Sequence, residues 1–321
     1  MAGQKVKVSV GIPVYNGENF IAEAIESVLA QTYDALELII VDNDSADGTR
    51  DICERYAAQD DRVKYFKNNK NIGAAPNYNR CFELSTGEYF KWMAHDDWIS
   101  PNYIELCVEV LDNYEEFGLA YGMPREMFDR DTPYLFSEFT VPVWGKLEPA
   151  GRFAKAIRMD RTCHAIFGLY RRSVIEKTTM HRPYYTSDRV LVAETALLAH
   201  FAPVPEAIFY NRKHDQQSMA QSTNRAALNT WQDASNTKSY ATQDLSRLAH
   251  LWEVTKRYPE LASAWRLRAQ IATHVLHPEQ VLRYIDEAIG SIAPTFYPMA
   301  RGVAKSLLRA VKRPADYIHL R

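Results

Sequence analysis

Hydrophobic and polar positions follow two alternating periods over residues 6–121. Val6–Tyr15 (VKVSVGIPVY) is rich in β-branched residues and is predicted to be a strand. The run LELIIVD at Leu36–Asp42 is short, apolar and ends in an acid, which is typical of a buried parallel strand. Further expected elements are a helix that starts near Ile21, helices at 47–58 and 76–84, strands at 63–66 and 89–93, and a helix that follows Ser100-Pro101 as N-cap and first-turn proline. Alternating strands and helices predict an α/β fold, a mostly parallel sheet flanked by helices.

The pattern is looser after residue 122. Strands are expected at Cys163–Tyr170 and Ala207–Lys213, with a helix at Arg189–Ala199 between them. Residues 216–237 are polar and indicate a lid or linker, and helical spacing dominates from residue 238 onward. The sequence therefore predicts a first domain at 1–215, a lid or linker at 216–237, and a helical region at 238–321.

The composition of the chain argues against several classes of protein. The chain has 321 residues, is 46% hydrophobic and carries a formal net charge of -2, so no overall charge attracts nucleic acid. Its four cysteines have no zinc-site spacing and are expected to be reduced and mostly buried. No apolar run reaches the roughly 20 residues of a membrane span, and the N-terminus has too short an apolar run for a signal peptide. We expect a cytoplasmic protein.

The candidate chemistry lies in WMAHDDWIS, where Asp96 and Asp97 adjoin a predicted strand end. Two ionised carboxylates about 5 Å apart repel by roughly 3 kcal/mol at an effective dielectric constant near 20. The acids could favour the positive end of the following helix, or lie in a hydrated turn, although tryptophans flank them. A third interpretation is a Mg²⁺ or Mn²⁺ site that carries a phosphorylated ligand, because a divalent cation keeps both acids ionised. The sequence contains neither GxxxxGK[ST] nor GxGxxG, so a P-loop nucleoside triphosphatase and a dinucleotide dehydrogenase are not indicated.

A series of segments in order resembles the inverting family 2 glycosyltransferases. The segments are GIPVYNGENF, SVLAQTY, VDNDSADGT, NKNIGAAPNYNRC, GEYFKWMAHDDW, HAIFGLYRRSVI and TSDRVLVAE, and they cover roughly residues 6–215. The resemblance implies the GT-A nucleotide-sugar fold and transfer of a sugar from a nucleotide-diphosphate donor. Two positions depart from the usual pattern: Asn43 and Asp44 replace the acid and glycine of VDDGS, and Ala94 replaces the first acid of DxDD.

The resemblance also implies roles for individual residues on the donor side. Asp97 should be the main metal ligand, Asp96 should approach the ribose or the metal, and His214 in NRKHDQQS should reach the metal or the diphosphate. An acid at position 42 suits the imide N–H of uracil or thymine and could also accept from guanine; the alternative is that it caps a turn. The expected nucleotide-pocket residues are Pro13, Tyr15, Asn16, Asp42, Asn71, Gly73, Asn77 and Asp96. Gly73 could instead simply permit a turn with positive φ.

Asp188, in TSDRVLVAE, stands where the family places its general base. An inverting transfer needs a carboxylate that takes the proton of the acceptor hydroxyl as the diphosphate leaves. The competing interpretation is an N-cap, because SDRVLVAE opens a helix. The expected reaction is transfer from a UDP-sugar, with Mn²⁺ or Mg²⁺, to a saccharide or lipid-linked saccharide hydroxyl in surface polysaccharide or glycolipid synthesis.

Residues 296–313 (FYPMARGVAKSLLRAVKR) carry five basic residues and no acid, and place them on one side of a helical wheel. This pattern indicates peripheral contact with an anionic membrane on its inner face, and the alternative is a terminal helix packed on the domain. Two further functions remain open. A sugar-phosphate nucleotidyltransferase should show a glycine-rich loop with a basic residue, which GIPVYNGEN lacks. A nucleotide-sugar-binding protein without activity is suggested by Asn43 and Ala94.

Overall fold

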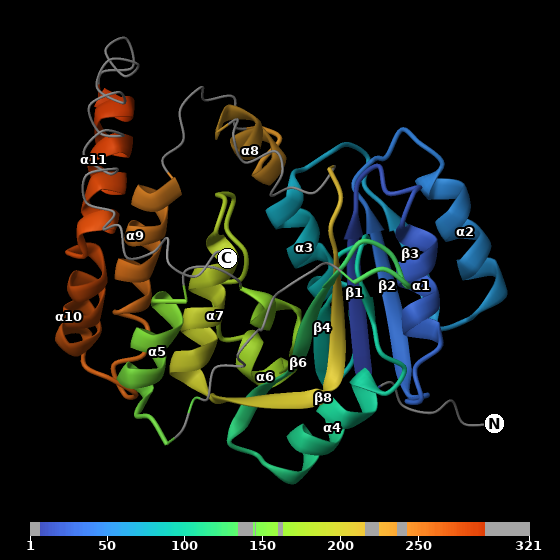
Figure 1. The fold of residues 1–321 in the computed structure, drawn as a ribbon, viewed down its shortest axis with the longest axis horizontal. Coiled ribbons are helices and arrows are strands. Elements are labelled where there is room, and N and C mark those ends of the chain that lie inside the picture. The colour runs from blue at the N-terminus through green and yellow to red at the C-terminus, as the bar shows by residue number, and fades with distance from the viewer. Residues whose placement is uncertain are drawn as a thin grey trace, which may run out of the picture.

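The structure is a computed structural model that describes residues 7–133, 144, 146–159, 163–215, 225–235 and 243–292. The strands of this part form one eight-stranded sheet in the order β3-β2-β1-β4-β7-β6-β8-β5 (Figure 1). The strands are β1 (Val8–Val14), β2 (Leu36–Asp42), β3 (Val63–Lys67), β4 (Tyr89–Trp92), β5 (Trp98–Ile99), β6 (Phe117–Met127), β7 (Leu169–Arg171) and β8 (His200–Arg212). The helices are α1 (Ile21–Leu29), α2 (Thr49–Gln59), α3 (Ala74–Glu83), α4 (Tyr103–Asn113), α5 (Pro149–Ile157), the 3-10 helix η1 (His164–Phe167), α6 (Arg172–Ile175), α7 (Ser187–Leu198), α8 (Arg225–Gln232), α9 (Gln243–Val254), α10 (Ala264–Val275) and α11 (Pro278–Ile292).

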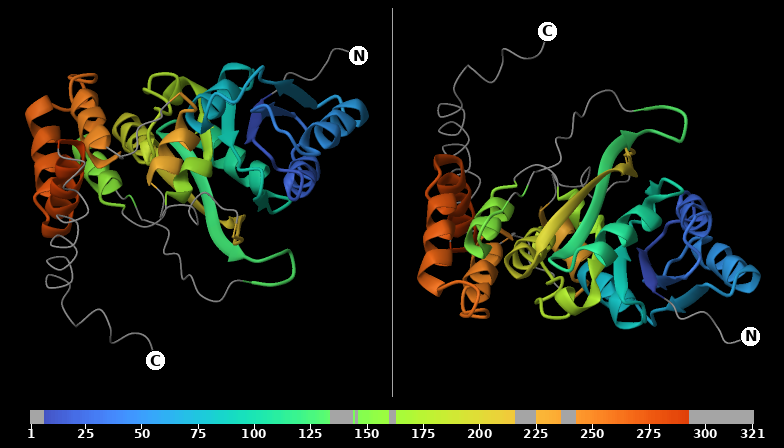
Figure 2. Two further views of the ribbon diagram at one scale, coloured as in Figure 1. Left: turned by 90° about the horizontal axis from the view of Figure 1, so that it is seen from above. Right: turned by 90° about the horizontal axis from the view of Figure 1, so that it is seen from below.

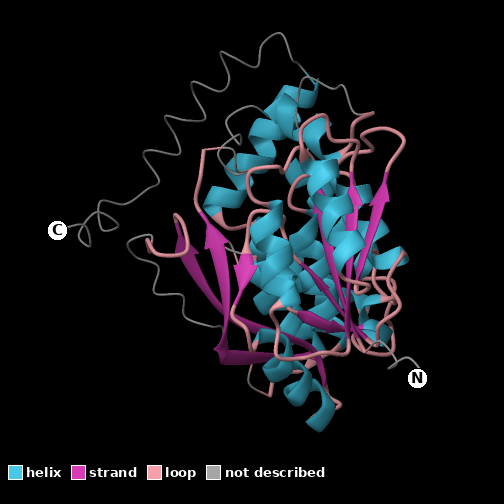
Figure 3. Ribbon diagram, turned by 90° about the vertical axis from the view of Figure 1, so that its right-hand side faces the viewer, coloured by secondary structure: helices cyan, strands magenta, loops and turns pink. Residues whose placement is uncertain are grey.

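The predicted α/β fold is confirmed. Strands lie between helical layers (Figure 3), and α9–α11 stack at the end of the molecule away from α1 and α2 (Figure 2). β1 pairs in parallel with both β2 and β4, with Val14 opposite Asp42 in the first pairing. The carboxyl ends of these strands therefore meet at one edge of the sheet, which brings the segments after Asp42 and Trp92 together.

The second half of the sheet is mixed, and here the sequence analysis was less accurate. β7 is antiparallel to β4 and β6, whereas β6 and β8 are parallel. The strand expected at Cys163–Tyr170 is instead η1 followed by the short β7, and β6 was not predicted. The prediction that Ser100 is the N-cap of the following helix was also wrong. α4 begins at Tyr103, with Asn102 as its N-cap residue. The Ser100 hydroxyl instead accepts a hydrogen bond from the backbone N–H of Ile208 in β8 (3.0 Å).

The core consists of one apolar layer on each face of the sheet. Along β2, Leu38 and Ile40 belong to the layer beneath α1 and α4, whereas Ile39 and Val41 belong to the layer beneath α3 and α7. This alternation follows from the two-residue period of a strand. Each fully buried aliphatic side chain contributes about 1.5–3 kcal/mol relative to exposure, so both layers stabilise the sheet. The four cysteines are free thiols and three are buried.

Lys91 in β4 is a cation inside this core. Its side chain has no exposed surface, its ammonium donates a hydrogen bond to the Phe167 carbonyl, and it lies 4.5 Å from the centre of the Tyr103 ring. Burial lowers the pKa of Lys91 from 10.5 to about 7. The folded protein therefore disfavours the charged form that water stabilises in the unfolded chain.

Substituting Lys91→Met is expected to stabilise the protein near pH 7, by roughly 4 kcal/mol at most, because each pKa unit corresponds to about 1.4 kcal/mol. Between the folded and unfolded pKa values the unfolded chain binds the extra proton, so the free energy of unfolding of the natural protein rises with pH above about 7. The gain from Lys91→Met should shrink toward pH 10. Urea unfolding at pH 7 and 9.5 measures this, with the exposed Lys70→Met as control. An increase in stability that is equal at the two pH values would contradict this prediction.

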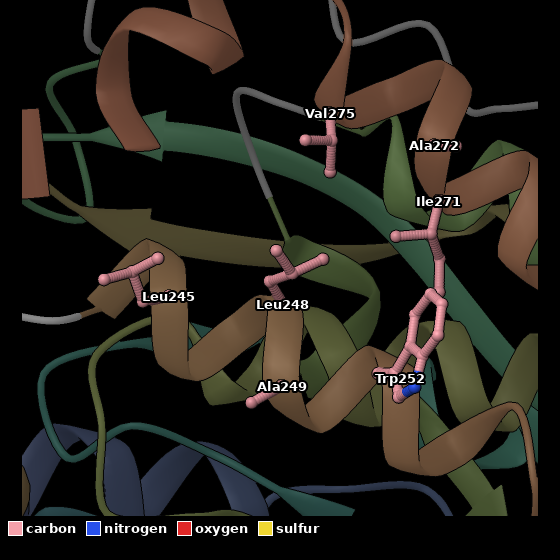
Figure 4. A pocket seen from close by; sticks show the side chains of 7 residues that line it. All are labelled: Leu245, Leu248, Ala249, Trp252, Ile271, Ala272 and Val275. Atoms are coloured by element: carbon pink, nitrogen blue, oxygen red, sulfur yellow. The ribbon is translucent and has the colours of Figure 1, made fainter. Parts of the chain in front are cut away.

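The helical C-terminal region is present over α9–α11. Leu245, Leu248, Ala249, Trp252, Ile271, Ala272 and Val275 line a cavity of about 560 Å³ between α9 and α10 (Figure 4). The lining is apolar throughout and offers no charged group for a diphosphate. None of the helices in the described ranges combines the length and hydrophobicity needed to cross a membrane. The basic segment 296–313 lies outside the described residues, so its membrane contact stays a prediction.

Candidate functional site

Asp96 and His214 meet at the carboxyl edge of the sheet. Asp96 follows β4 and His214 follows β8, and the Asp96 Oδ2 atom lies 2.9 Å from His214 Nε2. The two side chains are each 15% exposed, so the pair is accessible from solvent. Burial opposes ionisation of Asp96, but the hydrogen bond from His214 and the nearby His95 outweigh it and hold the Asp96 pKa below its usual value. The carboxylate is thus ionised beside an imidazole.

Asp97 has a different environment. Its side chain is 2% exposed, and Oδ1 accepts hydrogen bonds from the backbone N–H of Arg212 (2.9 Å) and from Asn211 Nδ2 (3.0 Å). Burial and the neighbouring charge of Asp96 raise the pKa of Asp97 well above its usual value. One oxygen of Asp97 therefore joins the β4 end to β8.

The residues present could hold a divalent cation only in part. Within the described residues no group of three or more His, Cys, Asp and Glu side chains is arranged around one point. An oxygen of Asp96 and a nitrogen of His214 suit Mn²⁺, and donor phosphate oxygens and water would complete the coordination.

Arg212 fixes the strand end that carries His214, and the sequence analysis missed it. Its guanidinium lies 4.9 Å from the Phe20 ring centre and 4.6 Å from that of Trp98. Its Nε donates to the Asp96 carbonyl (3.0 Å), and its terminal nitrogen pairs with Glu23. The segment NRKH offered the signal, since an arginine two positions before a candidate ligand can order it.

The turns after β1 and β2 form the expected nucleotide side of the site. Asn16 has a left-handed backbone (φ 52°), its N–H donates to Ser45 Oγ (2.9 Å), and its Oδ1 accepts from the Ala46 N–H (2.9 Å). Pro13 is buried in β1, whereas Tyr15 is 44% exposed. The two turns are thereby tied together beneath an exposed aromatic ring.

Asp42 accepts hydrogen bonds at both oxygens. Its Oδ1 accepts from the Ser45 N–H (2.8 Å) and its Oδ2 from the Tyr65 hydroxyl (2.7 Å), and the side chain is fully buried. The capping alternative for Asp42 is therefore realised in the structure. A carboxylate can accept further hydrogen bonds, so contact with a base stays a prediction.

A cluster of asparagines shapes the neighbouring loop. Asn43 donates to Asn71 Oδ1 (2.9 Å) and the Gly73 carbonyl (3.3 Å) and accepts from Asn68 Nδ2 (3.0 Å). Asn77 accepts from Asn68 (2.8 Å) and donates to the backbone of β2 (2.9 Å). Gly73 adopts φ +89°, in agreement with the prediction that this glycine permits a turn with positive φ. Asn71 and Asn77 thus hold this loop, and contact with a nucleotide stays a prediction for them.

Restoring the common family acid by Asn43→Asp is expected to destabilise the protein by about 2 kcal/mol. The amide donor of Asn43 would become an oxygen facing the Asn71 oxygen and the Gly73 carbonyl, beside Asp42. Chemical denaturation measures the loss, with the exposed Asn69→Asp as control. Equal stability of the Asn43→Asp variant and the natural protein would contradict this role.

Asp188 lies in the first turn of α7, after Thr186, whose φ of 74° is left-handed. Thr186 is the N-cap residue, so the cap interpretation of Asp188 is not what the structure shows. Burial raises the pKa of Asp188, and the charges of Arg189 and Arg247 lower it only in part. Burial and then the charges of Asp96, Asp97 and Asp188 raise the pKa of Tyr78.

The described part of the predicted lid is α8 and the three residues after it. A Cβ atom at Gly73 would lie 2.5 Å from the carbonyl of Gln232, so the end of α8 packs directly on the start of α3. Trp231 of α8 also approaches Tyr185, with ring centres 6.4 Å apart. α8 therefore contacts both the asparagine loop and the segment before Asp188.

The helix-flanked sheet, with carboxylates at the carboxyl ends of β2 and β4, agrees with the GT-A fold that the resemblance implies. The chain belongs to glycosyl transferase family 2, whose model matches residues 9–179. An uncharacterized glycosyltransferase of Rickettsia typhi is 39% identical over 130 residues, which are 40% of this chain and 39% of that relative. The alignments thus span well under half of such relatives, and Asp188 lies beyond the residues that the family model matches.

Solved structures share the fold. S. aureus TarS 1–349 in complex with UDP-GlcNAc has a TM-score of 0.62 at 15% identity, covering 88% of this chain and 79% of that one. The mannosyltransferase PcManGT of Pyrobaculum calidifontis, in complex with GDP-Man and Mn²⁺, has a TM-score of 0.52 at 16% identity, covering 92% and 88%. At this identity the likeness establishes the fold alone.

Proposed function

We propose that this glycosyltransferase is metal-dependent and inverting, and that it moves a hexose from a nucleotide-diphosphate sugar to a saccharide or lipid-linked saccharide hydroxyl. The observation that carries the proposal is the pairing of Asp96 with His214 (2.9 Å) at the carboxyl edge of the sheet. Asp188, the acid in the first turn of α7, would serve as the base. We prefer a UDP-sugar on the frequency of uridine donors in the family more than on the chemistry of Asp42, which could also accept from guanine. The complexes of TarS with UDP-GlcNAc and of PcManGT with GDP-Man and Mn²⁺ support a donor and ion of these classes.

The donor end positions the diphosphate. A divalent ion bound there would offset the charge that grows on the diphosphate leaving group. Asp96 and His214 would hold that ion, and Arg212 keeps them in place through the Asp96 carbonyl. The sequence predicted Asp97 as the main ligand; since one of its oxygens already binds β8, we place Asp96 and His214 nearer to the ion.

The acceptor end moves the proton. Asp188 accepts the proton of the acceptor hydroxyl as that oxygen attacks the anomeric carbon from the side opposite the leaving group, which inverts its configuration. The desolvation that raises the Asp188 pKa makes it a stronger base than an exposed carboxylate. Tyr78 and Tyr184 are among the groups that feel the charge of Asp188.

Surface polysaccharide or glycolipid synthesis would suit these parts, and basic residues 296–313 would bring the enzyme to the inner face of an anionic membrane. Co-sedimentation of the full chain with anionic vesicles checks this contact. If no more protein pellets with anionic than with neutral vesicles, the proposed membrane contact is wrong.

The proposed function is tested by thermal unfolding with UDP, GDP, dTDP and their sugars, with and without Mn²⁺. We expect one nucleoside diphosphate to stabilise the protein, and more strongly with Mn²⁺, because a ligand at 100 times its dissociation constant adds about 2.7 kcal/mol. Stabilisation by a nucleoside triphosphate and a sugar phosphate instead would indicate a nucleotidyltransferase. Binding of a sugar nucleotide without any transfer or hydrolysis would indicate an inactive binding protein.

A further inference from the structure

Residues 178–187, here called the base loop, run directly into α7 and Asp188. The loop is held from α3 by Asn79, whose side chain donates to the His181 carbonyl (2.9 Å) and accepts from the His181 N–H (3.0 Å). At the surface, Arg182 forms a two-pronged pair with Glu253 of α9 (2.7 and 2.8 Å). Helices from two different parts of the chain therefore fix this loop.

A chain of partly buried hydrogen bonds passes from the base loop through α9 and back. The Tyr184 hydroxyl lies 2.8 Å from Nδ1 of His250, and His250 Nε2 lies 2.6 Å from Thr179 Oγ1. The Thr179 hydroxyl in turn lies 2.6 Å from Oε2 of Glu194 in α7. His250 is 2% exposed and Glu194 is fully buried.

The partners of Glu194 and Thr179 set the direction of the bonds at that end of the chain. Glu194 receives the Thr179 N–H (2.7 Å) at Oε2 and the Arg257 Nε–H (3.0 Å) at Oε1, so it acts as an acceptor. The Thr179 hydroxyl has one hydrogen, which it donates to Glu194, so it must accept from Nε2–H of His250. Burial lowers the pKa of His250 to about 4, so the ring is neutral and Nδ1 accepts from the Tyr184 hydroxyl.

This chain bears on the site because Tyr184 begins the turn that presents Asp188. The Ser187 N–H donates to the Tyr184 carbonyl (3.3 Å), and Thr186 in this turn has a left-handed backbone. A turn with such a residue keeps its shape only where the surroundings determine it. Tyr184 is the residue of this turn whose side chain is held from α9.

We propose that His250 is a positioning residue for the transfer reaction: through the Tyr184 hydroxyl it fixes the base loop and so the orientation of Asp188. This inference rests on the proposed function. It makes the helical C-terminal region part of the catalytic apparatus, although the family model ends at residue 179. The sequence analysis treated residues 238–321 as a helical appendage, and the structure assigns α9 a task at the site.

The test compares His250→Phe, Tyr184→Phe and the variant that carries both changes. Arg158→Gln is the control, because it removes an exposed hydrogen bond to Gln270 of α10 (3.0 Å) that lies outside the base loop. Release of UDP from UDP-GlcNAc, or of GDP from GDP-mannose, is followed with Mn²⁺. We expect kcat to fall about 10- to 100-fold in both single variants, since small displacements of reacting groups have effects of this size. The dissociation constant of the nucleoside diphosphate should stay within about twofold, and Arg158→Gln should retain its kcat. The double variant should be no slower than His250→Phe, because both changes break one chain.

Amide hydrogen exchange gives a readout that needs no substrate. In His250→Phe and Tyr184→Phe, residues 184–188 should exchange faster, while the amides of β1 should be unchanged. Unchanged exchange in residues 184–188, or equal losses of kcat and nucleotide affinity, would overturn the positioning role. Asp188→Asn separates the two proposals. If that variant loses turnover and His250→Phe does not, only the positioning role fails. If the natural protein releases no nucleotide from any sugar nucleotide of UDP, GDP or dTDP, the proposed function fails.

Discussion

Asp188→Asn is expected to lower kcat by about 10²- to 10⁴-fold, the contribution typical of a general base, while donor binding stays nearly unchanged. The amide keeps the shape of the carboxylate but cannot take the acceptor proton. Transfer kinetics and calorimetry with the nucleoside diphosphate measure the two quantities separately. Asp51→Asn is a matched control, because it removes an exposed acid from the first turn of another helix, α2, and should leave kcat unaltered.

The pH dependence of kcat provides a second check on Asp188. The charged or titratable groups around it are Tyr78, Cys163, Tyr170, Tyr184, Tyr185, Arg189 and Arg247. Because burial raises the Asp188 pKa, kcat should decline on the acid side at a pH above the usual range of an aspartate. Full activity of Asp188→Asn with an unaltered acid limb would exclude Asp188 as the base.

Asp96→Asn and His214→Ala are expected to weaken binding of Mn²⁺ together with UDP by roughly 10- to 100-fold each, as the loss of a group at a metal site commonly does. The reason is that these two side chains meet at 2.9 Å on the solvent-accessible edge of the sheet. Calorimetric titration of UDP with and without Mn²⁺ measures the change.

Asp97→Asn is the matched comparison for Asp96→Asn. Its carboxyl is directed to Arg212 and Asn211, so its effect on Mn²⁺-dependent binding should be smaller. Normal Mn²⁺ affinity in Asp96→Asn together with lost affinity in Asp97→Asn would reverse our order of the two acids.

The strands that position the site could be predicted because the apolar pattern that defines each of them lies within the strand itself. β2 coincides with the predicted Leu36–Asp42, since a strand covered on both faces is a continuous apolar run. β6 was missed because FGLAYGMPREM contains two glycines and a proline, and its pairing with β7 and β8 makes it a strand. The start of α4 was placed too early because the side chain of Ser100 binds β8, which no neighbouring residue reveals.

The part of the site that could be predicted is the part where the family resemblance indicated residues that are far apart in the sequence. Asp96 and His214 are 118 positions apart and were both expected at the metal, and they do lie together. Asn43 was regarded as a departure from a pattern, whereas the structure shows that it holds a loop through partners 25–30 positions away. His250 gave no signal, because a buried polar residue in an amphipathic helix looks like a surface position until its partners are known.

The most direct test of the account is an anomalous difference map, recorded at the manganese edge, from crystals of the protein grown with Mn²⁺ and UDP. We expect one peak within about 2.0–2.3 Å of a carboxylate oxygen of Asp96 and of His214 Nε2, shared with the diphosphate. UDP bound at the edge formed by β1, β2 and β4 without manganese, or manganese at another place in the molecule, would contradict the metal-dependent mechanism.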